Sequence, residues 1–115
     1  MCDTRMINNA ETLVCEAVNR AFEALRPGVV KVTADGLYNK KGNIPLPVAT
    51  ARHFCFRLLH DVYGLPYSAI ARRAGMNVTS VIKKVRKVRL MVFTDEIYKT
   101  VNTYINEDLE IKNEH

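Results

Sequence analysis

The chain has 115 residues, enough for one compact domain, and its 48% hydrophobic content is ordinary for a packed globule. No apolar run approaches the length of a membrane-spanning helix, and the first residues lack the apolar core of a signal peptide. We therefore expect a cytoplasmic protein with no membrane partner. The three cysteines have no CxxC spacing, which argues against a disulfide framework or a zinc site, and we expect no metal and no cofactor.

The charge is distributed unevenly along the chain. Residues 1–93 hold 15 Lys and Arg against 6 Asp and Glu, whereas residues 94–115 hold 2 against 6. The formal net charge of +5 therefore combines a body of +9 with a tail of −4. Between Arg52 and Arg89 there are nine basic residues, and Asp61 is the only acid. Such a body favours a polyanionic partner, and nucleic acid is the commonest one for a basic domain without a membrane segment.

Apolar residues recur with helical period from about Asn9 to Leu25 and are followed by Pro27 and Gly28. This pattern predicts a first amphipathic helix, preceded by a loose N-terminus over residues 1–8. Beyond it, residues 29–32 could form a short extended piece or a connector that leads to a single turn capped by Thr33. The sequence alone leaves both structures open.

Residues 39–47, NKKGNIPLP, form the clearest loop, because glycine and two prolines disfavour a regular helix or a central strand. Lys40 and Lys41 are adjacent in this loop. They can be ordinary solvated residues, or they can form a basic arm that contacts phosphates or a minor groove. A long central helix is then predicted from Val48 to Tyr63, where apolar residues again follow helical spacing.

Several residues of potential chemical interest fall within the helical patterns. Cys15 and Cys55 lie among apolar residues and are interpreted as small core residues. His53 and His60 lie near Cys55 in the sequence but do not form a set of nucleophile, base and orienting group. We therefore expect no catalytic residue and no enzyme activity.

Residues 67–86 carry the pattern of a helix-turn-helix, in which a short helix and a longer one meet at a sharp corner. Pro66 precedes the first helix, where its missing N–H does no harm. Small Ala71 lets the two helices approach closely, and Gly75 can take the positive φ that turns the chain.

The second helix of this unit is predicted to begin near Val78, with Asn77 or Thr79 as its N-cap. Its valines recur at steps of three and four and define one apolar face. The opposite face and its flanks are basic and hydroxyl-rich without any acid: Thr79, Lys83, Arg86, Lys87, Ser80 and Lys84. A run of Lys and Arg is often only a solvated face, but solvated faces normally mix charge signs. The pattern therefore favours contact with DNA.

A closing helix is predicted over residues 95–109, with Thr94 as its N-cap and a further apolar stripe. Its acidic outer face would be repelled by DNA, so we expect it to lie away from the binding surface or to cover a neighbour in a homodimer. The expected fold is thus an all-α, single-domain bundle. It consists of a DNA-binding core over residues 9–93 and an acidic helix and tail over residues 94–115.

Two segments match a known pattern. TARHFCFRLLHDVYGLPYSAIARRAG, residues 50–75, has an Ala-Arg start, an aliphatic face and an Ile-Ala-Arg at residues 70–72, and GLYNKKGN lies upstream. Residues 13–90 thereby resemble the C-terminal duplex-binding domain of the bacterial chromosomal replication initiator DnaA, a helix-turn-helix of the Trp-repressor-like kind. That family's turn signature, Gly-Gly-Arg-Asp-His-Thr-Thr-Val, is replaced here by a turn one residue shorter, Gly75 to Val81, without the Arg-Asp-His. Its DNA sequence preference is therefore not expected here.

The resemblance implies that Lys40, Lys41 and Arg52 hold the DNA backbone or minor groove, while Thr79, Ser80 and Lys83 face base edges or flanking phosphates. The full set of candidate DNA contacts is Lys40, Lys41, Arg52, Arg72, Asn77, Thr79, Ser80, Lys83, Lys84 and Lys87. We expect sequence-specific binding of double-stranded DNA by a stand-alone initiator-like domain, in replication or transcription regulation. The alternative is a protein-interaction module whose contact surface is the helix over residues 95–109.

Overall fold

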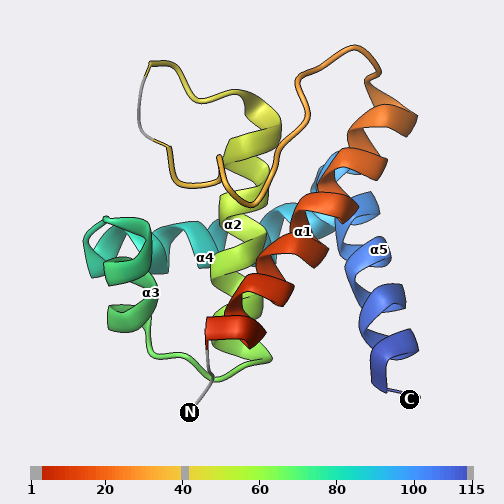
Figure 1. The fold of residues 1–115 in the computed structure, drawn as a ribbon. Helices are drawn as coiled ribbons and strands as arrows, with labels where there is room; N and C mark the ends of the chain where they lie inside the picture. Colours follow the sequence, from red (N-terminus) through yellow and green to blue (C-terminus); the bar gives the residue numbers. More distant parts are fainter. Residues whose placement is uncertain (1–3, 40–41, 114–115) are drawn as a thin grey trace.

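The computed structural model describes residues 4–39 and 42–113, with side chains described as far as residue 110. Its helices are α1 (Thr4–Leu25), α2 (Leu46–Asp61), α3 (Tyr67–Ala74), α4 (Val78–Thr94) and α5 (Glu96–Asn113). No strand occurs in these two ranges. The expected all-α bundle is confirmed (Figure 1).

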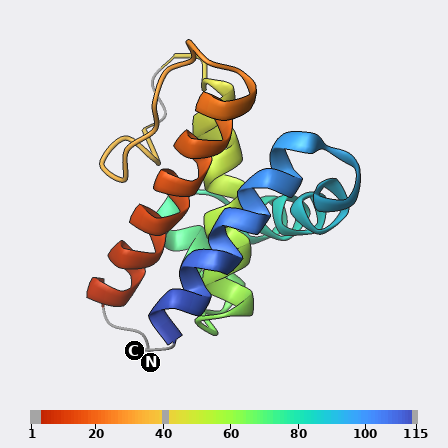
Figure 2. The same cartoon turned by 90° about the vertical axis from the view of Figure 1, so that its right-hand side faces the viewer.

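The helices pack around α2, which runs through the middle of the molecule (Figure 1). α1 packs against both α2 and α5, and α4 packs against the same two helices. Figure 2 shows α1 and α5 side by side, with the corner between α4 and α5 projecting from the bundle. The fully buried aromatic rings Phe54 and Phe56 belong to α2, because a central helix presents apolar residues on more than one side.

Helix α1 begins at Thr4, so the prediction of a loose N-terminus is wrong for residues 4–8. Most of these residues are exposed, and the extra turns therefore show no apolar periodicity in the sequence. A distant contact supports this end of the helix, since Arg73 Nη2 donates a hydrogen bond of 2.8 Å to Asn8 Oδ1.

The segment between α1 and α2 is a connector that leads into one turn. Asn19 pairs with the backbone of Val32 in both directions: its Nδ2 donates to the carbonyl oxygen at 2.8 Å, and its Oδ1 accepts from the N–H at 2.9 Å. Thr33 then caps the turn as predicted, because its Oγ1 accepts a hydrogen bond of 3.2 Å from the N–H of Gly36. The single-turn alternative is thereby confirmed.

Helix α2 begins at Leu46, two residues before the predicted start at Val48, and ends at Asp61 rather than Tyr63. Pro47, expected in the loop, lies in its first turn. A proline is tolerated there because the first helical N–H groups have no intrahelical partner. Cys15 and Cys55 are buried as predicted, and burial raises the pKa of the Cys15 thiol to about 12.

The helix-turn-helix over α3 and α4 has the predicted corner. Gly75 takes a left-handed conformation with φ 68°, and Met76 N–H donates to the Ala71 carbonyl at 2.9 Å. Asn77 rather than Thr79 is the N-cap of α4, since its Oδ1 accepts from the Ser80 N–H at 2.8 Å. The first turns of α4 are therefore held by a side chain from the corner itself.

Helix α5 closes the bundle. The prediction that Thr94 caps it is wrong, because Thr94 ends α4 and Asp95 is the cap. Asp95 Oδ1 accepts hydrogen bonds from the N–H groups of Ile97 at 2.9 Å and Tyr98 at 3.1 Å. The apolar stripe of α5 is buried, with Val101 fully inaccessible, so this helix serves as part of the core.

Candidate nucleic-acid interface

Helix α4 separates an apolar face from a basic one. Val81, Val85 and Val88 are fully buried, which fixes the rotation of the helix about its axis. The outward residues Thr79, Lys83, Arg86 and Lys87 are exposed, while the flanking Ser80 and Lys84 are half-buried. Between Val78 and Thr94 the helix carries five basic residues and no acid.

Most of the cations on α4 are not neutralised within the described part of the chain. Asp61 accepts from Arg89 Nη2 at 2.7 Å and lies 3.5 Å from Arg57 Nε. No ion pair or hydrogen bond joins the side chains of the other four basic residues of α4 to another described residue: Lys83, Lys84, Arg86 and Lys87. Uncompensated like charges raise the potential over a surface, so this helix is suited to an anionic partner.

Arg52 has a different position from the one expected of a direct DNA contact. Its Nε donates to the Leu37 carbonyl at 2.6 Å, and its Nη2 donates to the Asn39 carbonyl at 2.6 Å. The guanidinium thus fixes the end of the turn over residues 33–39 to α2. These two bonds use two of the N–H donors of Arg52, so only its other N–H groups could donate to a phosphate.

Three of the predicted contacts converge on His53. Burial, as the largest cause, and then the positive charges of Lys84, Lys87 and Arg52 together lower the pKa of His53 to about 4. The ring Nδ1 lies 3.1 Å from the Tyr98 hydroxyl. These cations of α4 and α2 therefore lie close enough to the buried ring to disfavour its protonation.

Arg72 is exposed on α3. It lines an open groove of about 690 Å³ between the start of α1 and the loop before α3. Ser68, one turn earlier, lines the same groove, whose remaining wall is mostly apolar. Arg72 makes no ion pair with a described residue, so its guanidinium is available to an anionic partner.

A buried ionic cluster is centred on Glu11. Charge and composition did not predict it. This carboxylate is 3% exposed and accepts two hydrogen bonds of 2.7 Å from Arg73 and one of 2.7 Å from the Tyr38 hydroxyl. It joins α1, α3 and the turn over residues 33–39. A glutamate on the apolar side of an amphipathic helix was the available signal, because such a residue needs a cationic partner.

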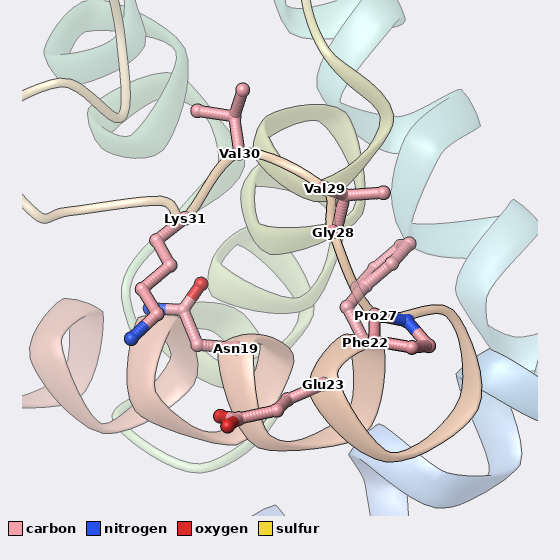
Figure 3. Close-up of a pocket in the computed structure, with 8 residues that line it drawn as sticks. All are labelled: Asn19, Phe22, Glu23, Pro27, Gly28, Val29, Val30 and Lys31. Carbon is pink, nitrogen blue, oxygen red and sulfur yellow. The ribbon is translucent and has the colours of Figure 1, made fainter.

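A crevice of about 290 Å³ at the end of α1 is lined by Asn19, Glu23 and Lys31, with Val29 and Val30 projecting in different directions (Figure 3). Among the described residues, no group of His, Cys, Asp or Glu could hold a metal ion, and every buried side-chain N or O atom has a hydrogen-bond partner. None of the helices described is both long and apolar enough to cross a bilayer.

Lys40 and Lys41, the predicted basic arm, lie outside the described residues. The structure thus brings Asn77, Thr79, Ser80 and Lys83 together at the start of α4, and it places Lys84, Lys87 and Arg52 within electrostatic range of His53. Comparison with protein-family models, with curated protein sequences and with solved structures finds no match to this chain.

Proposed function

We propose that the chain binds double-stranded DNA, with α4 as the helix that enters the major groove. The observation that carries this proposal is the charge of α4, which bears five basic residues and no acid, with only Arg89 paired among the described residues. A helix of this kind after a short helix and a glycine corner is the arrangement that helix-turn-helix proteins use to reach base edges.

Two roles are assigned within this interface. The lysines contact phosphates and supply most of the affinity, which is independent of base sequence. Thr79 and Ser80 occupy the first turn of α4, the part of a recognition helix that reaches base edges, and their hydroxyls discriminate between base pairs. Asn77 Oδ1 is used as the helix cap, so only its amide nitrogen is left for DNA.

Arg52 is assigned a positioning role in this proposal. Because it bonds the carbonyls of Leu37 and Asn39, it determines where the chain leaves the turn towards the two lysines that follow. A stand-alone initiator-like domain in replication or transcription regulation is the biological role that the resemblance to the DnaA duplex-binding domain supports.

The test measures binding of the full chain to a labelled duplex by fluorescence anisotropy, over a range of salt concentrations. Each lysine on a phosphate contributes about 0.9 to the slope of log K against log salt. Replacing Lys83 and Lys87 by Ala should therefore weaken binding to every duplex and reduce the magnitude of that slope by about 1.8.

The matched control replaces the exposed Lys31 and Lys99, on the connector and on α5, and changes the net charge by the same amount. This variant should bind within about twofold of the unmodified chain, since exposed charges far from the contact act only through a screened field. Absence of duplex binding at low salt, or equal losses in both double variants, would refute the proposed interface.

A further inference from the structure

Helix α4 continues beyond the part that would read DNA bases. Its 17 residues span about 25 Å at 1.5 Å per residue, whereas a recognition helix contacts base edges with its N-terminal residues. The second half of the helix leads to the corner with α5 that projects from the bundle (Figure 2). This half therefore has room for a contact other than DNA.

The outward face of α4 changes character along its length. At 100° per residue, Leu90 and Phe93 continue the face that begins with Thr79 and Lys83. Leu90 is 71% exposed and Phe93 is 76% exposed, the two highest values among the exposed large apolar side chains of the described residues. The face is polar and basic at the start of the helix and apolar at its end.

The residues before and after this apolar pair in the sequence include charges of opposite sign. Arg86 precedes Leu90 by one turn on the same face, and Glu96 opens α5 three residues after Phe93. Both are exposed, and neither side chain makes an ion pair with a described residue. Asp95, in contrast, is already used as the cap of α5.

We propose that two copies of the chain pair about a two-fold axis through the end of α4. In this arrangement the helices run antiparallel, with Leu90 and Phe93 packed on the same two residues of the other copy. The segment before the apolar pair in one copy then lies opposite the segment after it in the other, so Arg86 meets Glu96 of the partner subunit. A parallel pairing would instead place Arg86 against a like charge, which disfavours it.

A second copy is the expected partner because this surface is complementary to itself: the apolar pair can pack on its own copy, and the flanking charges have opposite signs. An isologous contact requires this property, whereas a different protein would have to supply it independently. As far as residue 110, no large apolar side chain of α5 is exposed, so this part of the helix offers no larger apolar surface for pairing. With two apolar side chains per copy the interface is small, and the dimer should be weak, dissociating in the micromolar range.

The test is sedimentation equilibrium of the full chain without DNA, from about 1 to 500 µM, which brackets a weak dimer. Replacing Leu90 and Phe93 by Ser should weaken dimerisation at least about tenfold, as expected when the centre of an interface is removed. The control is Val30→Ser on the connector, which removes an apolar side chain of similar exposure, 66%. This change should leave dimerisation unaffected.

Charge reversal tests the antiparallel pairing itself. Arg86→Glu and Glu96→Arg should each weaken the dimer by roughly fivefold, and the chain carrying both changes should recover it, because the pair is then restored with opposite signs. A circular dichroism melt of each variant checks folding. A chain that stays monomeric throughout, a dimer unchanged by the two serines, or reversals that do not compensate would each refute the proposal. Since DNA is absent, none of these results depends on the proposed function.

Discussion

His53 is buried in α2 with three cations around it and the Tyr98 hydroxyl 3.1 Å from its Nδ1. Because its pKa is lowered to about 4, the folded chain keeps this ring neutral at pH values where an unfolded histidine is protonated. The unfolded state therefore binds more protons than the folded state between about pH 6.5 and pH 4, and the free energy of unfolding must fall as the pH falls through that window.

The expected loss between pH 7 and pH 5 is about 2 kcal/mol from this residue alone. His53→Gln removes the titrating group and should remove this part of the pH dependence. Urea unfolding of both chains at the two pH values measures it, with the pH 7 values as the internal reference. Parallel pH dependence in the two chains would show that the ring is not held neutral in the folded state.

Sequence reasoning at the scale of residues identified which side chains are charged but not what they contact. Arg52 was predicted to hold DNA, yet it bonds two carbonyls of the turn at 2.6 Å. Arg73 was only one of the nine basic residues counted between Arg52 and Arg89, yet it pairs with Glu11, 62 positions away in the chain. Such pairings depend on how helices are placed in space, which no local pattern contains.

The helices were predictable at the scale of elements wherever an apolar stripe marked them. The interiors of all of the described helices follow such stripes, because burial of one face is what stabilises a short helix in water. The ends were less predictable. α1 extends to Thr4 through polar residues, and α5 takes Asp95 as its cap rather than the adjacent Thr94, a residue with the same capping chemistry.

The start of α4 depends on one side chain, and this gives a prediction about Asn77. Its Oδ1 satisfies the Ser80 N–H at 2.8 Å, one of the donors that a helix start leaves without a partner. Asn77→Ala should lower the free energy of unfolding by about 1 kcal/mol, whereas Asn77→Ser, which retains a capping oxygen, should lower it far less. Urea unfolding at pH 7 compares the two, and equal losses would show that the cap contributes nothing.

At the scale of the whole molecule, tertiary contacts join the two predicted DNA-binding parts, the helix-turn-helix and the loop with the two lysines. These parts are distant from each other in the sequence. Glu11 holds Arg73 of α3 and Tyr38 of the turn over residues 33–39 in one cluster, and Arg52 anchors the same turn to α2. The helix-turn-helix and the turn that leads to the lysine loop are thus parts of one rigid frame. Composition predicted the basic charge of this frame, while its geometry required the tertiary structure.

Pairing through the end of α4 also bears on how the chain can bind DNA. Leu90 and Phe93 continue the face that begins with Thr79 and Lys83, so packing them on the other copy turns this face of each helix towards the partner. The base-reading segments of the two copies then point in opposite directions, and one duplex cannot contact both. The proposed dimer and the proposed DNA complex are therefore alternative states of the chain.

Binding of DNA should therefore separate the two copies. Sedimentation of the chain at concentrations where the dimer predominates, with and without a saturating selected duplex, should show one copy per duplex. Selection of bound duplexes from a random pool should return a single asymmetric motif, both from the unmodified chain and from the chain with Leu90 and Phe93 replaced by Ser. An inverted repeat from the unmodified chain would mean that two DNA-bound copies pair through another surface.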